Sequence, residues 1–333
     1  MKTKRIKNIT LIAGIFLFTI IIRVCFVEIY SVTGDSMENT LLAGDKILVN
    51  KAVYGARMPS SPYEIPWINL FCHVAGVKSF DWGYHRLKGY SDYKRGDVMV
   101  FTNPLFNLQS DFFIKRCTAL PGDTLLIKNG LVKVNGLVQY VPAMSKNTYR
   151  INIHNTGKFN SLTDSLGIRS IKSFDAPRSL AMTLTYRQQQ QIKNHVDSVF
   201  IRTDRDNCIN PEDSLFQWTR NNYGPLVIPR KGMTVPMDKY HCFLYEKTIR
   251  YFEKQPVEWE NGQYYINDSI ITNYTFRHNY FFMMGDNRVS SSDCLDWGFF
   301  IPEENIAGKV SVVLYSYKKG KGFTWKRLLK NTQ

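Results

Sequence analysis

The chain has 333 residues, enough for one large or two modest domains, which excludes a peptide hormone or a mini-scaffold. Its 44% hydrophobic and 21% charged residues exclude disorder as the main state. The net charge is +15, but four cations lie before residue 9 and six after residue 317, with no acidic residue in either cluster. Only +5 remains between them, which argues against nucleic acid as a partner and favours an anionic lipid bilayer at both ends.

An apolar run occupies residues 9–30, and its first part, Ile9 to Ile22, carries no charge. As a helix, these 22 residues span about 33 Å, which matches a bilayer core of ~30 Å. A cleaved signal peptide and a buried core helix are the alternatives, and bulky residues at 29–30 argue against cleavage. The cations of the predicted tail 1–8 place the N-terminus in the cytoplasm, and Arg23 can extend to the interface. Everything from about Ser31 onward would then lie outside.

A second apolar stretch, Ile65 to Val77, is too short to span a bilayer and is interrupted by Pro66, Asn69 and His73. Its large apolar side chains could dip into the membrane interface. An ordinary buried loop is the alternative, and the sequence leaves both open.

Strand signals recur in the exported part. Residues 46–50 and 97–101 are short apolar runs after Gly-Asp turns, which predicts two buried strands. Residues 125–128 and 131–134 flank an Asn-Gly pair, which predicts a tight hairpin because Asn-Gly accepts positive φ angles. Further strands are expected in three ranges: 263–266, 280–284 and 309–315. The fold class predicted is mostly β.

The character of the sequence changes between residues 140 and 279. This range is more polar, with one modest helix expected over 186–198, so we expect an insertion or second lobe with mixed α/β structure. Residues 31–139 and 280–317 are then expected to form a catalytic β core, and residues 318–333 a basic C-terminal tail. The six cysteines contain no C-x-x-C pair, so spacing indicates no zinc site, and a pairing of Cys208 with Cys242 stays open.

Ser36 is the first candidate for chemistry. It lies in Thr33-Gly34-Asp35-Ser36-Met37, a turn followed by a helix-capable apolar run over 37–43. At such a chain reversal the hydroxyl is exposed and a backbone N–H can point at an oxyanion. By itself, such a serine is more often a turn or N-cap residue.

Lys115 is the second candidate. Three apolar residues precede it, and the strand leads to a Pro-Gly-Asp turn, so Lys115 is expected to face inward while Arg116 faces the other way. Burial lowers a lysine pKa and makes the amine a possible general base. The alternative is a lysine that extends to solvent at a strand edge.

The third candidate is the loop over residues 284–293, which combines a Gly-Asp-Asn turn with several hydroxyl and carboxylate side chains. It can orient a neighbouring amine, or it can be a solvated surface loop. The three pieces together predict chemistry without histidine, because a neutral lysine can take the serine proton directly.

These pieces resemble the bacterial type I signal peptidases, also called leader peptidases. The matching boxes stand in the family's order behind an N-terminal anchor: Gly34-Asp35-Ser36-Met37, Arg95-Gly96-Asp97-Val98, Ile114-Lys115-Arg116 with Pro121-Gly122-Asp123, and Gly285-Asp286-Asn287-Arg288 with Ser291, Asp293 and Trp297-Gly298. The resemblance implies a signal-peptidase-like β fold and a serine endopeptidase that removes signal peptides from exported preproteins. It implies an enzyme of the bacterial cytoplasmic (inner) membrane with one span and an extracytoplasmic catalytic domain. Residues 140–279 fall largely outside it.

The resemblance also implies roles. Ser36 would be the nucleophile, with its own backbone N–H in the oxyanion hole, and Lys115 would be the general base within hydrogen-bonding reach. Ser291 would orient the lysine. Asp286 with Arg116, and Asp293, would support the site. No metal and no organic cofactor is expected.

Three departures from the family pattern matter. Asn39 stands where the serine box usually has proline, and Gly34 stands where some members have a serine that assists the oxyanion. Leu295 replaces an arginine often found two residues after the aspartate, so we expect Asp293 to pair with Arg288 or another cation.

Three other classes of protein are weighed against this function. A self-cleaving Ser/Lys repressor would need a DNA-binding module and no anchor. A penicillin-binding enzyme would need a Lys-Thr-Gly partner for its Ser-x-x-Lys motif, and the chain contains none. A membrane-tethered binding protein would not need Ser36 or Lys115 at all.

Overall fold

The computed structural model describes residues 2–78, 80–102, 112–168, 172–176, 178–203, 217–318, 320 and 322–332. Cys208, Lys319 and Lys321 lie outside these ranges. The chain forms two compact units: the first contains Met1–Val32, Gly44–Phe113 and Glu304–Thr332, and the second contains Thr33–Ala43 and Ile114–Glu303. All seven predicted site residues belong to the second unit.

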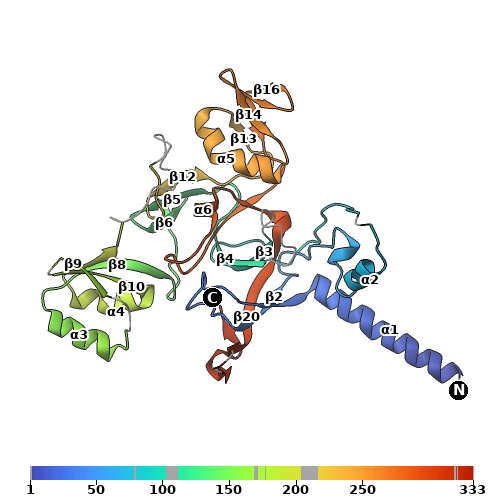
Figure 1. The fold of residues 1–333 in the computed structure, drawn as a ribbon, viewed down its shortest axis with the longest axis horizontal. Helices are drawn as coiled ribbons and strands as arrows, with labels where there is room; N and C mark the ends of the chain where they lie inside the picture. The colour runs from blue at the N-terminus through green and yellow to red at the C-terminus, as the bar shows by residue number, and fades with distance from the viewer. Residues whose placement is uncertain are drawn as a thin grey trace. The chain divides into compact units, whose positions relative to one another are not determined.

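The first unit combines a long N-terminal helix with an antiparallel sheet in the order β1-β2-β20-β3 (Figure 1). Alternating burial along β2 shows the two-residue period expected of a strand with one face on the core. The elements are α1 (Lys2–Cys25), β1 (Val27–Ser31), β2 (Asp45–Asn50), η1 (Pro62–Glu64), α2 (Ile68–Val74), β3 (Val98–Thr102), β20 (Ile306–Lys318), β21 (Gly322–Phe323), η4 (Trp325–Arg327) and β22 (Lys330–Asn331).

Helix α1 is long and apolar enough to cross a membrane over Lys7–Cys25. It ends five residues before the predicted end of the apolar run, and residues 27–31 form β1 instead. Glu28 explains the difference, because a carboxylate is costly inside a bilayer. Its side chain forms ion pairs with Arg23 at 3.0 Å and Lys51 at 2.6 Å, which fix the turn from helix to strand.

Helix α2 is not a buried loop. Leu70, Phe71 and Val74 are 63%, 66% and 82% exposed. Trp67, which precedes the helix, contacts Phe16 of α1 with 5.5 Å between ring centroids, and the Arg23 guanidinium lies 5.7 Å from the Trp67 ring centroid. The exposed apolar side chains therefore belong to a short helix that lies beside the part of α1 that is long enough to cross a membrane (Figure 1).

The segment predicted as a basic tail is folded onto the sheet, since β21 and β22 both pair with β20. Arg327 is buried and donates through Nε to Oδ1 of Asp45 at 2.8 Å. At least one of the six C-terminal cations therefore has a structural partner within the protein.

The second unit contains several small sheets and the remaining helices. Its elements are β4 (Phe112–Ala119), β5 (Thr124–Lys128), β6 (Leu131–Val134), β7 (Leu137–Val138), β8 (Lys146–Asn152), α3 (Thr156–Ser165), β9 (Lys172–Ala176), β10 (Ser179–Thr185), α4 (Tyr186–Ile192), η2 (Lys193–His195), β11 (Ser198–Ile201), β12 (Tyr223–Val227), β13 (Thr234–Pro236), α5 (Lys239–Phe252), β14 (Val257–Glu260), β15 (Gln263–Ile266), β16 (Ser269–Ile271), β17 (Asn273–Thr275), β18 (Tyr280–Met284), α6 (Cys294–Trp297), β19 (Ile301–Pro302) and η3 (Glu303–Asn305), which runs into the first unit.

The predicted hairpin is confirmed as β5 and β6. Asn129 and Gly130 have φ angles of +49° and +75°, the conformation that an Asn-Gly turn favours. Strand β18 is buried at all five residues and pairs with β4 and β19. The prediction of a mostly β fold behind an N-terminal apolar helix is confirmed.

Part of the range 140–279 has a core of its own. Strands β8–β11 form one sheet, which lies beside α3 and α4 (Figure 1). Buried apolar side chains from these helices and strands form one core cluster. The helix expected over 186–198 is shorter: a capping box between Thr185 and Gln188 starts α4, and the chain passes through η2 into β11. The last residue of the predicted helix, Ser198, therefore belongs to a strand.

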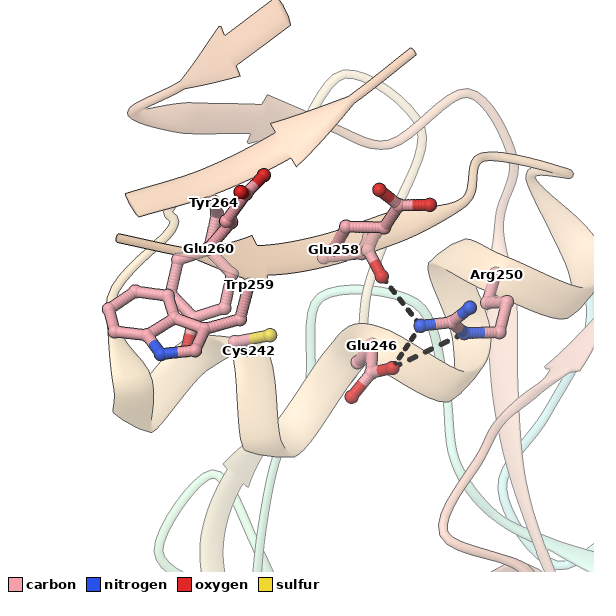
Figure 2. A pocket seen from close by; sticks show the side chains of 8 residues that line it. Cys242, Glu246, Arg250, Glu258, Trp259, Glu260 and Tyr264 are labelled. Carbon is pink, nitrogen blue, oxygen red and sulfur yellow. Dashed lines mark hydrogen bonds and ion pairs between the residues drawn. The ribbon is translucent and has the colours of Figure 1, made fainter. Parts of the chain in front are cut away.

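Residues of helix α5 and strands β14 and β15 line an open pocket of about 450 Å³ (Figure 2). Trp259 and Tyr264 lie side by side at one end, and Arg250 bonds Glu246 within it. None of the predicted site residues lines this pocket.

Candidate active site

Ser36 lies in a turn at the start of the second unit's first segment and is half-buried. The run after it forms a single turn rather than a helix: the Met37 carbonyl accepts hydrogen bonds from the N–H groups of Thr40 and Leu41 at 3.1 and 2.7 Å. Asn39 has a φ angle of +74°. Proline is fixed near −65°, so the asparagine at this departure permits a turn that proline would prevent.

Hydrogen bonds to the loop over 285–291 hold the serine segment. Asn287 donates its backbone N–H to the Ser36 carbonyl at 3.0 Å and its side-chain amide to the Asp35 carbonyl at 3.1 Å. Ser290 donates its hydroxyl to the Asp35 carboxylate at 2.8 Å. Gly285 is also in this contact, because a β-carbon added there would lie 2.6 Å from the Ser36 carbonyl oxygen and overlap Ser291. The backbone of Ser36 therefore lies beside the predicted loop over 284–293.

Asp286 is buried and accepts three strong side-chain hydrogen bonds. Arg116 donates through Nε and Nη2 at 2.8 and 2.6 Å, the paired geometry in which arginine holds a carboxylate. Thr40 donates its hydroxyl to the same carboxylate at 2.6 Å. Asp286 therefore joins β4, the serine segment and the loop after β18.

Lys115 is 3% exposed on β4. Within the described part of the chain, its amine takes part in no hydrogen bond or ion pair. Burial is the main cause that lowers the pKa of Lys115, and the carboxylate of Asp293 partly opposes this effect. An amine in such surroundings is favoured in its neutral form, which is the form that accepts a proton.

Asp293 is fully buried and lies near two arginines. Its Oδ2 accepts hydrogen bonds from Ser291 Oγ at 2.8 Å and Gly285 N–H at 3.0 Å. Arg288 Nη1 and Arg220 Nη2 lie 3.7 and 3.8 Å from the same oxygen. Asp293 also caps α6. It thus connects the hydroxyl of Ser291 to the end of β18.

Two of the expected contacts do not appear among the described residues. No hydrogen bond joins Ser36 Oγ to Lys115 Nζ, and Ser291 Oγ bonds Asp293 rather than Lys115. The roles of Ser36, Lys115 and Ser291 therefore stay predictions, as does that of the Ser36 N–H.

Sequence reasoning missed Thr40, Arg220 and Asp296. Thr40 follows Ser36 by four residues, a spacing that places it in the same turn and could have drawn attention to it. Arg220 lies in a polar stretch without a motif, and no sequence signal connects it to Asp293. Within the described ranges, no group of three or more His, Cys, Asp or Glu side chains could hold a metal ion.

Comparison with known proteins is consistent with this arrangement. The family model for signal peptidase, peptidase S26, matches residues 5–207 and 249–315. The signal peptidase I of Aquifex aeolicus is 26% identical over 307 residues, which cover 91% of this chain and 83% of that protein. The signal peptidase I of Buchnera aphidicola subsp. Schizaphis graminum is 23% identical and covers 91% and 73%. The signal peptidase I of Pseudomonas aeruginosa is 34% identical over 123 residues, or 37% of this chain and 35% of that protein.

The chain belongs to the signal peptidase family, peptidase S26. It is a signal peptidase I, a serine peptidase that cleaves signal peptides and acts on preproteins. The matched ranges include 140–207 and 249–279, so the expectation that 140–279 falls largely outside the family was wrong. Only 208–248 within that range lies outside the match.

Proposed function

We propose that Ser36 attacks the scissile carbonyl of the preprotein while Lys115 accepts the serine proton. The observation that carries the proposal is the burial of the Lys115 amine without a hydrogen-bond or ion-pair partner among the described residues. An unpaired ammonium group is costly in such a site, so the neutral amine is favoured and can serve as a base.

The covalent steps then follow. Serine oxygen bonds to the carbonyl carbon, the amide C–N bond breaks, and Lys115 returns its proton to the leaving amine. Water attacks the resulting ester, again with its proton taken by the lysine, and the serine hydroxyl is restored. The backbone N–H of Ser36 stabilises the oxyanion in both steps. The two hydrogen bonds from Asn287 support this role, because they fix the backbone carbonyls of Asp35 and Ser36, and Ser290 holds the Asp35 side chain.

The proposal requires Ser36 Oγ and Lys115 Nζ to come within hydrogen-bonding distance when substrate is bound. Catalytic hydrogen bonds are often long in free enzymes and shorten in the substrate complex. Gly285 supports close approach here, since it leaves no side chain between the Ser36 carbonyl and Ser291.

The test is cleavage of a preprotein by the detergent-solubilised full chain. We expect Ser36→Ala and Lys115→Met each to abolish cleavage while circular dichroism stays unchanged. Wild-type activity should rise with pH through the lowered pKa of Lys115, because only the neutral amine accepts the proton. Substantial cleavage by Lys115→Met, or a flat pH profile for the wild type, would show that another group is the base.

We also propose that α1 crosses the bacterial cytoplasmic membrane once, with residues from about 31 onward on the extracytoplasmic side. The excess of cations before the apolar run supports this orientation. The contact of Trp67 with Phe16 supports a bilayer position for α2 as well, because Phe16 lies within the part of α1 that is long enough to span. The lipid bilayer is then a partner of both helices.

The depth of α2 can be measured with a variant in which Trp67 is the only tryptophan. Lipids brominated along their acyl chains should quench its fluorescence in reconstituted vesicles, and aqueous iodide should quench it only weakly. Strong iodide quenching without bromine quenching would place α2 in water and leave α1 as the only membrane contact of the two.

A further inference from the structure

Besides Arg288, a second arginine, Arg220, lies near the carboxylate of Asp293. Among the charged groups near Lys115, this carboxylate favours the ammonium form most strongly. Asp293 has no exposed side-chain surface, so its charge requires compensation within the protein. Arg220 Nη2 lies 3.8 Å from Asp293 Oδ2 and 2.8 Å from the Ser291 carbonyl, to which it donates a hydrogen bond. Its other terminal nitrogen, Nη1, forms an ion pair with Asp296.

Arg220 contacts this loop at more points than Arg288 does. Arg288 Nη1 also lies within 4 Å of Asp293, but it is buried and has no hydrogen-bond partner among the described residues. Arg288 instead donates through Nη2 to the Arg220 carbonyl at 3.4 Å. The guanidinium of Arg220 therefore joins residues 291, 293 and 296 with the rigid fork geometry that lysine lacks.

The backbone around Arg220 is held in place. Thr219 donates its N–H to the Asn222 carbonyl at 2.8 Å, and its hydroxyl oxygen accepts a hydrogen bond from the Asn222 N–H at 3.0 Å, which closes a turn just before β12. The Asn129-Gly130 hairpin turn donates its two N–H groups to Asn222 and Asn221 at 3.0 and 2.8 Å. The turn that contains Arg220 is therefore held in place by the β5–β6 hairpin.

The position of Arg220 in the chain is informative. It lies within 208–248, the range between the two matches to the family model. Leu295 stands at the position where the resemblance implies an arginine beside the aspartate. One of the two arginines next to Asp293 therefore comes from a distant part of this chain.

We propose that Arg220 is a positioning residue of the active site, which balances the charge of Asp293, fixes the loop over 291–296 and so keeps the Lys115 amine neutral. The inference rests on the proposed role of Lys115 as the base. Besides burial, four groups act on the pKa of Lys115: Asp293, Cys294 and Asp296 raise it and Arg220 lowers it. Removal of Arg220 should therefore favour the ammonium form.

The experiment compares the pH dependence of kcat/KM for preprotein cleavage by the wild-type full chain and two variants. Arg220→Met should move the rising limb to higher pH and lower the rate at neutral pH, about tenfold for each pH unit of movement, because the rate below the pKa follows the fraction of free base. Asp296→Asn should move the limb to lower pH. Both variants break the same ion pair, so a merely structural role would not give shifts of opposite sign.

Arg250→Met is the matched control, since it removes an ion-paired arginine of the same unit whose partners among the described residues are Glu246 and the Val257 carbonyl. Its pH profile should equal that of the wild type. Arg220→Lys should shift the limb less than Arg220→Met, because it keeps the charge and loses the fork. If Arg220→Met does not fold, Arg220→Lys and Asp296→Asn still give the two opposite shifts.

Two outcomes would overturn the inference: a wild-type profile for Arg220→Met, or shifts of the same sign for Arg220→Met and Asp296→Asn. These outcomes are distinct from failure of the proposed function. If Lys115→Met still cleaves preprotein, the base itself is wrongly assigned. If Lys115→Met is inactive and Arg220→Met behaves like the wild type, only the role of Arg220 is wrong.

Discussion

The second unit contains two groups of acidic side chains whose surroundings differ. Around the serine segment, Asp286 and Asp293 have side chains 3% and 0% exposed, and arginines lie beside both. In the pocket between α5 and β14, Glu246 is 40% exposed, and Glu258 and Glu260 are exposed as well (Figure 2). The pocket also contains an arginine, Arg250, so both regions pair opposite charges.

The same kind of ion pair therefore affects the free energy of unfolding differently in the two regions. Water solvates the pocket carboxylates, so the loss of a partner there changes the free energy of unfolding little. The carboxylates of the site have lost their water and depend on named donors, so the loss of one partner leaves a buried charge without compensation. Only the buried group can therefore fix the geometry and protonation of the neighbouring residues.

The largest expected effect on stability is that of Arg116→Met. The change leaves the Asp286 carboxylate buried without its two arginine hydrogen bonds, and we expect the free energy of unfolding to fall by about 3–5 kcal/mol. Chemical denaturation of the detergent-solubilised protein, followed by circular dichroism, measures it. A loss below about 1 kcal/mol would mean that Asp286 is solvated after all.

Gly285→Ala should have the next largest effect. Its added β-carbon would lie 2.6 Å from the Ser36 carbonyl oxygen and 2.5 Å from the Ser291 β-carbon, so the serine segment or the loop must move. Overpacking of this kind costs about 1–3 kcal/mol, and a shift of the nucleophile by about 1 Å lowers kcat about 10²-fold.

Gly34→Ala is the matched control for stability, since a β-carbon at Gly34 meets nothing within 4 Å. We expect its free energy of unfolding to stay within about 0.5 kcal/mol of the wild type. If Gly285→Ala and Gly34→Ala lower the free energy of unfolding equally, close packing of Gly285 against Ser36 does not contribute to stability.

The sequence was sufficient for features that depend on local chemistry. Asn129 and Gly130 predicted their hairpin because a tight turn needs positive φ angles, and the apolar run over 280–284 predicted a strand, which the structure shows to be buried at all five residues. The end of α1 was misplaced because hydropathy gave too little weight to Glu28, whose ion pairs turn the chain into β1.

The site could be predicted only as far as its motifs reached. The boxes around Ser36, Lys115 and Asp286 pointed to residues that share one unit. Arg220 could not be found this way, because its contact with Asp293 depends on how a turn far along the chain is held by the β5–β6 hairpin. Such a contact is a property of tertiary packing, and no local pattern of residue types encodes it.

Of the two arginine substitutions, Arg250→Met should have the smaller effect on stability. Arg250 pairs with Glu246 one helical turn away at 2.6 Å, and both side chains are 40% exposed. Exposed pairs of this spacing contribute about 0.3–0.5 kcal/mol, and Arg250 also donates to the Val257 carbonyl, which adds about 1 kcal/mol. Denaturation under the same conditions as for Arg116→Met should therefore show a loss several times smaller. If Arg116→Met and Arg250→Met lower the free energy of unfolding equally, burial does not make the ion pairs of the site more important for stability than those of the pocket.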